Sequence, residues 1–226
     1  MITTVFLDID NTLLDFDLCA KQSMQESAKE FNIEYTDALF ETFKVINTDL
    51  WRRIEKGTLT REELFKIRWN TIFREEGIEA DGVEFEHRFR YHLADAAVPV
   101  ENSYEILDYL LGKYRIFAAS NATKEQQFKR LAIADMLKYF EDVFVSKDLG
   151  ADKPSKDFFQ GCFDRVEGLK KEEVIMIGDS ITADIKGGND YGLTTCWLNR
   201  KGEKSENYGV TPDYEITSLL ELKNIL

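Results

Sequence analysis

Residues 6–15 read FLDIDNTLLD, and the architecture can be predicted outward from them. The apolar run TTVFLD (3–8) ends at Asp8, and Asp10 and Thr12 follow at alternate positions. Because the run is rich in β-branched and aromatic residues, it predicts a buried strand. Carboxylates at the end of a buried strand are costly unless a partner or a chemical task accounts for them. We therefore expect a functional site where this strand ends.

Further runs of the same kind predict five more strands. They are RIFAAS (115–120), DVFVS (142–146), EVIMIGD (173–179), TTCWLN (194–199) and DYEIT (213–217). Helical patterns separate the later runs, for example at 124–137 and 182–192. Strands that alternate with helices predict an α/β fold, here a Rossmann-like, doubly wound parallel sheet with helices on both faces.

One long interval breaks this alternation, because residues 16–97 contain no convincing strand. Helical periodicity dominates there, with Gly57, Gly77 and Gly82 as expected helix stops. Thr60 and Glu63 form a capping box in front of residues 64–73. We predict an all-helical domain over 16–97, inserted into an α/β domain made of 1–15 and 98–226.

The composition excludes several classes of function. With 226 residues, 43% of them hydrophobic, the chain resembles an ordinary globular protein, and no run has the 18 apolar residues of a membrane span. We expect a cytoplasmic protein, because the N-terminus lacks a secretory pattern and the three cysteines suggest neither a disulfide framework nor a zinc site. The net charge of −13 argues against nucleic-acid and anionic-membrane partners. An anionic substrate would therefore need a local source of positive charge.

Polar residues stand at or after the ends of four predicted strands. They are Asp8, Asp10 and Thr12 after the first, Ser120-Asn121 at the second, Lys153-Pro154 after the third, and Gly178-Asp179-Ser180 with Asp184 after the fourth. Since ligands of open α/β sheets bind beyond the carboxyl ends of the strands, we expect these side chains to converge.

This series, D-x-D-x-T, S-N, K-P and G-D-S-x-x-x-D, is similar to the four motifs of the haloacid dehalogenase superfamily. The resemblance spans the chain, and the helical insertion lies where that superfamily places a cap domain of the C1 type. Asp10 separates its members, because the dehalogenases lack an acid/base aspartate there and the transport ATPases carry threonine. The resemblance thus implies phosphomonoester hydrolysis or phosphomutase chemistry.

The converging carboxylates indicate a metal ion. Two like charges 4 Å apart repel by about 4 kcal/mol at an effective dielectric constant near 20. A cation would relieve this repulsion, and ligands that are all oxygen favour Mg²⁺ over zinc. With the resemblance, this predicts Mg²⁺ as cofactor, held by Asp8, the backbone carbonyl of Asp10 and Asp179, with Asp184 as a ligand or hydrogen-bonded behind the ligands.

The resemblance and the chemistry together assign the other roles. Asp8 is expected to be the nucleophile that forms an aspartyl-phosphate. Asp10 is expected to protonate the leaving oxygen and then to take a proton from the attacking water. The expected phosphate-binding set is Thr12, Ser120, Asn121 and Lys153. Structural alternatives stay open: loop orientation for Thr12, a turn or cap for Ser120-Asn121, a solvated Lys153, and a helix-end charge for Asp184.

The substrate is predicted from the insertion. Residues 45–70 resemble the cap of the noncanonical pyrimidine nucleotidases at Asn47, Leu50-Trp51, Gly57, Leu59-Thr60 and Arg68, and agreement continues in 184–199 and 217–226. This implies hydrolysis of pyrimidine nucleoside 5′-monophosphates. Phe16, Trp51 and Arg68 are candidate specificity residues, although Trp51 could be a core aromatic and Arg68 could form a surface ion pair.

Other functions remain open from the sequence alone. One is hydrolysis of sugar phosphates or small phospho-acids, such as phosphoglycolate or acylneuraminate 9-phosphate. A phosphomutase and a non-catalytic binding protein with the same fold are further alternatives. The expected partner is in every case a small phosphomonoester, and the chain is expected to be a monomer or a homodimer.

Overall fold

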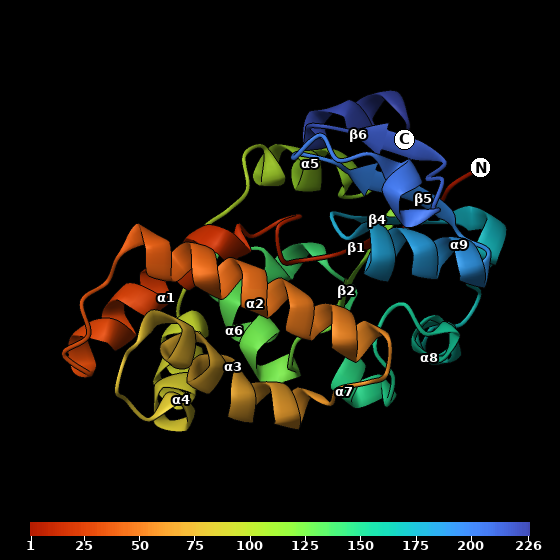
Figure 1. Cartoon of the computed structure of the whole chain (residues 1–226). Coiled ribbons are helices and arrows are strands. Elements are labelled where there is room, and N and C mark those ends of the chain that lie inside the picture. The colour runs from red at the N-terminus through yellow and green to blue at the C-terminus, as the bar shows by residue number, and fades with distance from the viewer. The chain divides into compact units, whose positions relative to one another are not determined.

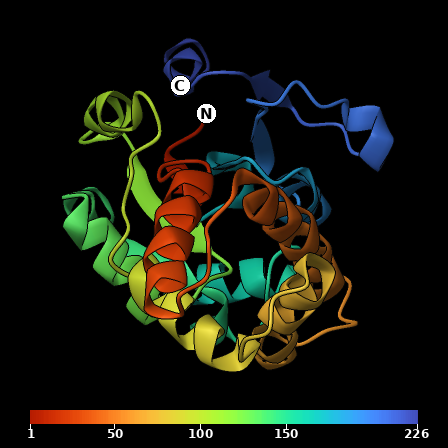
Figure 2. The same cartoon turned by 60° about the vertical axis from the view of Figure 1, so that its left-hand side comes forward.

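The computed structural model describes residues 1–226 and separates into two compact units. The α/β unit consists of Met1–Phe16 and Ala97–Leu226, and the helical unit consists of Asp17–Ala96. Both ends of the chain belong to the α/β unit, and they lie near one another in two views (Figures 1 and 2). The interpretation of these units as catalytic core and cap remains a prediction.

The α/β unit is built on one sheet of six parallel strands in the order β3-β2-β1-β4-β5-β6. The strands are β1 (Thr4–Leu7), β2 (Arg115–Ser120), β3 (Asp142–Val145), β4 (Val174–Gly178), β5 (Thr194–Leu198) and β6 (Tyr214–Ile216). Each strand lies within a run predicted from the sequence, and the predicted α/β fold class is confirmed. The strand order reverses between β1 and β4, so the crevice for a ligand is expected beyond the ends of these two strands.

Alternate strand residues face opposite sides of the sheet, and each side has its own core. Leu7 and Ile177 pack in one cluster with Leu131 of α6 (Lys124–Ile133), and α5 (Ser103–Leu110) adds to the same side. Phe6 packs in the other cluster with Phe158 of α8 (Lys156–Arg165) and with the end of α9 (Gly187–Tyr191). Because both faces are covered, β1 to β5 are buried at nearly every position, which is why they were recognisable as continuous apolar runs, whereas the edge strand β6 exposes two of its three residues.

Short helical segments complete the α/β unit. They are η1 (Leu137–Tyr139), α7 (Ser146–Leu149), η2 (Lys171–Glu173), η3 (Ile181–Lys186), η4 (Ser205–Tyr208) and η5 (Leu219–Asn224). The segment η3 has π-helical geometry, and two residues separate it from the end of β4.

The helical unit holds α2 (Asp37–Glu55), α3 (Arg61–Glu76), α4 (Gly82–Leu93) and almost all of α1 (Phe16–Glu30), drawn red to yellow in Figure 1. Its core is aromatic: the Trp69 ring lies 4.4 Å from Phe85 and 5.4 Å from Phe43, measured between centroids. Such pairs contribute about 0.5–1.5 kcal/mol beyond their buried area. No helix of either unit is long and apolar enough to cross a membrane.

The helix ends follow the predicted signals with one exception. The capping box of Thr60 and Glu63 is present, and Gly57 and Gly77 follow α2 and α3 with φ of 68° and 66°. Gly82 was expected to be a stop, but it is the first residue of α4. A Cβ on Gly82 would lie 2.4 Å from the backbone nitrogen of Asn70, so this glycine permits close packing of α4 against α3.

Candidate active site

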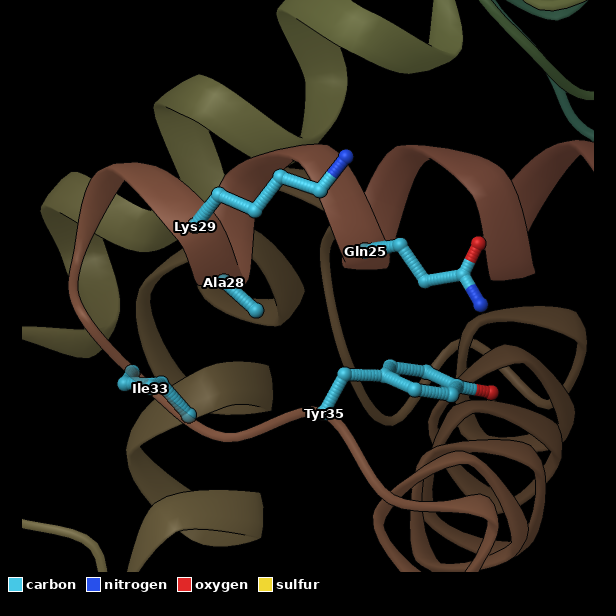
Figure 3. A pocket seen from close by; sticks show the side chains of 5 residues that line it. All are labelled: Gln25, Ala28, Lys29, Ile33 and Tyr35. Atoms are coloured by element: carbon cyan, nitrogen blue, oxygen red, sulfur yellow. The ribbon is translucent and has the colours of Figure 1, made fainter.

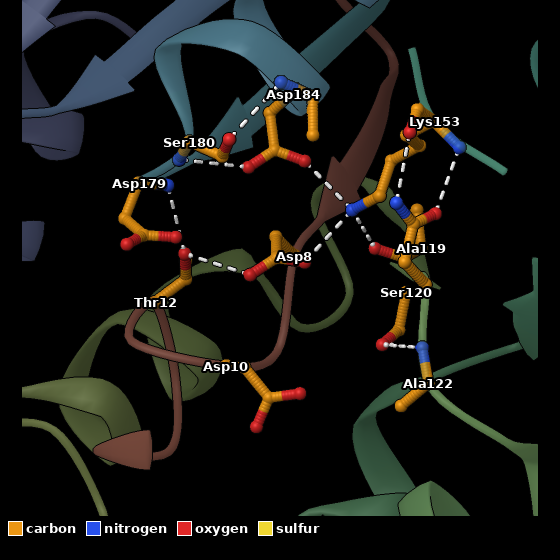
Figure 4. Close-up of polar contacts among 12 residues, drawn as sticks. Asp8, Asp10, Thr12, Ala119, Ser120, Ala122, Lys153, Asp179, Ser180 and Asp184 are labelled. Carbon is orange, nitrogen blue, oxygen red and sulfur yellow. Dashed lines mark hydrogen bonds and ion pairs between the residues drawn. The ribbon is translucent and has the colours of Figure 1, made fainter. Parts of the chain in front are cut away.

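A buried lysine joins two of the predicted carboxylates at the carboxyl ends of β1 and β4. The Lys153 ammonium donates to Asp8 Oδ1 at 2.8 Å and to Asp184 Oδ1 at 2.7 Å, and its third hydrogen bond goes to the Ala119 carbonyl at 2.6 Å (Figure 4). Lys153 is only 2% exposed, so it is not the solvated lysine considered as an alternative. All three of its N–H groups are engaged in this network.

Asp179 adds a third carboxylate to this network. Oxygen atoms of Asp8, Asp179 and Asp184 all lie within 4.8 Å of one another. The side chain of Asp10 is not part of this group, and Figure 4 shows its carboxylate set apart from the contacts of Asp8 and Lys153. The group therefore holds three carboxylates, of which Lys153 contacts two.

The surroundings of these carboxylates oppose their ionisation. Burial, the largest cause, raises the pKa of Asp8 to about 7; the Lys153 charge lowers this pKa, and the Asp184 and Asp10 charges raise it. Burial and the Asp8 and Asp184 charges also raise the pKa of Asp179 well above its ordinary value. Burial alone would lower the pKa of Lys153, but the two carboxylates raise it above the ordinary lysine value. The site thus lacks positive charge, and its all-oxygen donor set suits a hard divalent cation.

The start of η3 places Asp184 in the site. Its Oδ2 accepts a hydrogen bond from the Ser180 backbone N–H at 3.1 Å, while Oδ1 accepts from Lys153. A Cβ on Gly178 would lie 2.1 Å from Asp184 Oδ2, so only glycine at the end of β4 leaves room for this carboxylate. Asp184 is 1% exposed, which argues against the reading as an ordinary charge at a helix end.

Thr12 links the first and fourth motifs. Its hydroxyl donates to Asp8 Oδ2 at 3.3 Å and accepts from the Asp179 backbone N–H at 3.1 Å. The side chain is fully buried. Because its hydroxyl proton is directed at Asp8, the contacts favour the orienting role over the predicted phosphate contact.

The second motif serves two purposes. The Ser120 hydroxyl accepts from the Gln127 side-chain amide at 2.8 Å and from the Ala122 backbone N–H at 3.2 Å. Asn121 pairs instead with the backbone of Lys153: its Oδ1 accepts from the N–H at 2.8 Å, and its Nδ2 donates to the carbonyl at 2.9 Å. Asn121 therefore fixes the segment that carries Lys153, a contact that the sequence analysis did not anticipate.

Two residues at the site were missed by the sequence analysis. Gln127 and Arg130, both fully buried on α6, donate hydrogen bonds to the Asp10 carboxylate at 2.7 Å and 2.5 Å. The only available signal was their spacing of three residues, which places them on one face of the helix that follows Ser120-Asn121. A glutamine and an arginine in such a helix ordinarily indicate a solvated face, so the pattern alone could not identify them.

Comparison with known proteins now decides the family. Residues 2–192 match the family model of haloacid dehalogenase-like hydrolases. The chain belongs to this family. It is 35% identical over 223 residues to the HAD-hydrolase YfnB of Bacillus subtilis, covering 99% of this chain and 94% of YfnB. The crystal structure of YfnB bound to magnesium, which reveals interdomain movement in that protein, matches 100% of this chain and 98% of its own with a TM-score of 0.95.

A second relative has a described substrate class. The chain is 32% identical over 228 residues to the pyrimidine 5′-nucleotidase PynA of Streptococcus pneumoniae, covering 98% of this chain and 96% of PynA. Both relatives are matched over nearly their whole length, so the resemblance includes the helical unit as well as the α/β unit.

The predicted specificity residues of this haloacid dehalogenase-like hydrolase have different surroundings. Arg68 is 3% exposed, pairs with Glu86 at 2.6 Å and 3.0 Å, and donates to Asn47 Oδ1 at 2.8 Å. Its guanidinium is thus committed inside the helical unit, and the ion pair expected at the surface is buried. These contacts favour a structural role for Arg68 over the predicted role in specificity.

Trp51 and Phe16 remain candidates. Trp51 is half-buried against the small cluster that contains Leu50 and Ile54, with the Arg61 guanidinium 6.0 Å from its ring centroid. Phe16 begins α1, and its backbone N–H donates to Asn11 Oδ1 at 3.0 Å. Asn11 has a φ of 61°, a conformation that asparagine tolerates better than most residues, and so it closes the loop that starts at Asp8.

The helical unit also has a surface hollow of about 290 Å³ (Figure 3). It is lined by Gln25, Ala28, Lys29, Ile33 and Tyr35. The hollow contains no carboxylate, and its one cation, Lys29, pairs with Glu26 at 2.6 Å. We assign it no part in the chemistry.

Proposed function

We propose that this protein is a Mg²⁺-dependent phosphomonoester hydrolase that acts through an aspartyl-phosphate on Asp8 and prefers pyrimidine nucleoside 5′-monophosphates. The observation that carries the proposal is the division among the four aspartates. Three carboxylates gather within 4.8 Å around one lysine, while that of Asp10 is held apart by α6. This arrangement suits Asp8 for attack, the group of Asp8, Asp179 and Asp184 for metal binding, and Asp10 for proton transfer.

The residues present fit the cofactor. Carboxylate oxygens are the ligands that Mg²⁺ prefers. Asp8 and Asp179 offer them from the adjacent ends of β1 and β4, and Asp184 offers one from η3. The carbonyl of Asp10 would complete the protein ligands. When bound, Mg²⁺ would neutralise charge on the phosphoryl group and on the clustered carboxylates. Its magnesium-bound relative YfnB supports this choice of ion.

In the first step, a carboxylate oxygen of Asp8 attacks phosphorus, and the bond from phosphorus to the ester oxygen breaks. Asp10 gives its proton to that leaving oxygen, so the alcohol departs neutral. The positive charge of Lys153, 2.8 Å from Asp8 Oδ1, stabilises the negative charge that develops at the phosphoryl group.

In the second step, water attacks the phosphorus of the aspartyl-phosphate. Asp10, now ionised, takes a proton from this water, and the bond from phosphorus to the Asp8 oxygen breaks. Inorganic phosphate and the starting form of Asp8 result. One carboxylate thus serves as acid and then as base, which explains why the first motif needs both Asp8 and Asp10.

Hydrogen-bond accounting supports Ser120 as a phosphoryl ligand. A hydroxyl has two acceptor lone pairs and one proton to donate. Both lone pairs of Ser120 accept protein N–H groups, from Gln127 and from Ala122. Its proton is then left for a phosphoryl oxygen. Asn121, by contrast, supports catalysis by holding the backbone of Lys153.

The substrate preference rests on resemblance. Asp10 favours phosphate esters over haloacids, because an alkoxide leaving group needs a proton that a halide does not. The full-length similarity to the pyrimidine 5′-nucleotidase PynA then favours nucleoside monophosphates. Sugar phosphates and small phospho-acids are the competing substrates.

The test is phosphate release, with Mg²⁺, from a panel of pyrimidine and purine nucleoside monophosphates, sugar phosphates and small phospho-acids. UMP and TMP are expected among the best substrates by kcat/KM. Asp8→Asn, purified in the same way, is the control for contaminating phosphatases. A preference for sugar phosphates would overturn the nucleotidase assignment alone, whereas an Asp8→Asn variant as active as the wild type would overturn the aspartyl-phosphate mechanism.

A further inference from the structure

We propose that Gln127 and Arg130 form a clamp that positions the Asp10 carboxylate for both proton transfers. The inference rests on the proposed phosphatase function and assigns two further positioning residues to it. Neither residue belongs to the motifs recognised in the sequence. Both act through Asp10 and not on the substrate directly.

The clamp is a closed triangle of hydrogen bonds. Arg130 Nη1 donates to Asp10 Oδ1 at 2.5 Å, and Gln127 Nε2 donates to Asp10 Oδ2 at 2.7 Å. The same Arg130 nitrogen also donates to Gln127 Oε1 at 3.0 Å. Each carboxylate oxygen thus has its own donor, so rotation about the last side-chain bond of Asp10 would break both contacts.

The burial of Arg130 supports the inference that this arginine positions Asp10. The Arg130 side chain is 0% exposed, whereas that of Asp10 is 27% exposed. A guanidinium is rarely placed so far from water unless a paired charge offsets the desolvation. Here the paired charge is a carboxylate at the open edge of the site. One side of Asp10 is therefore fixed from within the protein, and the other side is left accessible.

The clamp also keeps the proton-transfer group away from the other carboxylates. The Asp10 charge is close enough to Asp8 to contribute to its raised pKa, yet the Asp10 side chain stays outside the group formed by Asp8, Asp179 and Asp184. If it were free to rotate, a carboxylate this near could join that group as a metal ligand. A carboxylate bound to metal could no longer carry a proton to the leaving oxygen.

Gln127 connects the clamp with the phosphoryl site. Its Nε2 donates to Ser120 Oγ at 2.8 Å as well as to Asp10. The same side-chain amide therefore sets the direction of the Ser120 hydroxyl and one edge of the Asp10 carboxylate. Gln127 thereby fixes the position of the proton donor, Asp10, relative to the phosphoryl ligand, Ser120.

The experiment compares two esters whose leaving groups need a proton to different degrees. For UMP the leaving alkoxide requires Asp10 as acid, whereas p-nitrophenolate leaves p-nitrophenyl phosphate without it. Arg130→Met is expected to lower kcat for UMP by about 10²-fold or more, the usual range of general acid–base catalysis. The pre-steady-state burst of p-nitrophenol should slow by less than about tenfold, because phosphorylation of Asp8 remains possible. KM should change little for either ester.

Three variants make the test specific. Gln127→Leu removes the donor to Asp10 and the donor to Ser120 without removing a charge. It should show a smaller leaving-group-dependent loss than Arg130→Met, together with a loss common to both esters through Ser120. Arg130→Lys keeps a cation and should recover part of the activity on UMP. In an Asp10→Asn background, Arg130→Met should cause no further loss of kcat, because the residue through which it acts is already gone.

Each outcome separates the clamp from the proposed function. Equal losses for both esters in Arg130→Met, or losses that add when Arg130→Met is combined with Asp10→Asn, would overturn the clamp while the wild type remains a phosphatase. A wild type that releases phosphate from neither ester nor from the wider panel would instead overturn the proposed function, and the catalytic purpose of the clamp with it. Leaving-group dependence together with non-additivity would establish the clamp.

Discussion

Lys153 of the α/β unit and Arg68 of the helical unit are both buried among polar side chains, but their two networks differ in their balance of charge. In the α/β unit, Lys153 is 2% exposed and contacts two carboxylates, with Asp179 as a third member of the group. In the helical unit, Arg68 is 3% exposed and contacts one carboxylate, Glu86, and the neutral amide of Asn47. One network has an excess of negative charge, and the other is neutral.

The causes of the pKa shifts of Glu86 and Asp8 reflect this difference in charge balance. Burial raises the pKa of Glu86, and every neighbouring charge that acts on it, Arg68 first, lowers it. Burial also raises the pKa of Asp8, but there two carboxylates act in the same direction as burial. A neutral buried pair is complete in itself, whereas an excess of buried carboxylates requires a further cation. The neutral pair of Arg68 with Glu86 therefore indicates a structural role, and the position of Lys153 among surplus carboxylates indicates a chemical one.

The same substitution at the two buried cations gives the strongest test of this comparison. Lys153→Met should lower kcat for phosphate release by about 10³-fold or more, because the fixed charge beside the developing phosphoryl charge is lost. Steady-state kinetics with about 10 mM Mg²⁺ measure the effect, since the cation limits the repulsion among the carboxylates left behind. Retention of most of the activity would show that Lys153 only balances charge, as Arg68 does.

Arg68→Met should instead reduce stability by about 3–5 kcal/mol, because Glu86 is left as a buried charge without its partner. Urea unfolding measures the loss, and kcat of the folded variant should stay close to the wild-type value. The double variant Arg68→Met/Glu86→Leu should recover most of the stability. Burial already raises the pKa of Glu86 above 4.5. The loss of stability in Arg68→Met should therefore grow as the pH rises above 4.5 and shrink as the pH falls, because the uncompensated charge exists only when Glu86 is ionised. A fall in kcat with unchanged stability would return Arg68 to the list of substrate-binding residues.

Metal binding should distinguish the two networks directly. Mg²⁺ at 100 times its dissociation constant should stabilise the protein by about 2.7 kcal/mol, visible as a rise in Tm. Asp179→Asn should abolish this rise, and the Arg68→Met/Glu86→Leu variant should retain it. EDTA should remove the activity, and added Mg²⁺ should restore it. A full Tm response in the Asp179→Asn protein would place the ion elsewhere.

The same physics explains how much could be predicted from the sequence. Strands covered on both faces are apolar at nearly every position, so β1 to β5 were recognisable, and the residues at or after their ends defined where Asp8, Lys153 and Asp179 converge. The edge strand β6 was also predicted, although two of its three residues are exposed. The capping box at Thr60 could be predicted equally well, because its hydrogen bonds are local.

The failures concern residues whose meaning depends on distant partners. Arg130 and Arg68 have similar helical contexts in the sequence, yet Arg130 pairs with Asp10, the proposed proton-transfer carboxylate, and Arg68 pairs with a buried glutamate. Gly82 was read as a helix stop, although its absent side chain is needed for close contact with α3. In each case, tertiary packing decides the role, and local pattern carries no information about it.

A third ionic cluster, exposed and on the helical unit, should show the smallest effect. The Glu30 carboxylate accepts hydrogen bonds from Arg88 at 2.5 Å and 2.8 Å and contacts His92 at 2.8 Å. The Arg88 hydrogen bonds, followed by the His92 contact, lower the pKa of Glu30 from 4.5 to about 2. Because the pKa is lower in the folded state, the stabilisation is present above about pH 4.5 and is lost as the pH falls toward 2.

Glu30→Gln should therefore lower Tm slightly at pH 6, and its difference from the wild type should shrink by pH 3. Arg88→Gln should remove the same pH-dependent component, because it removes the first cause of the shift. About 1 M NaCl should reduce the effect of either substitution, since exposed charges are screened within about 3 Å at that ionic strength. A difference that persists unchanged through acid and salt would mean that Glu30 contributes by packing. The cluster of Glu30, Arg88 and His92 could then not be compared, as an exposed ionic network, with the two buried networks.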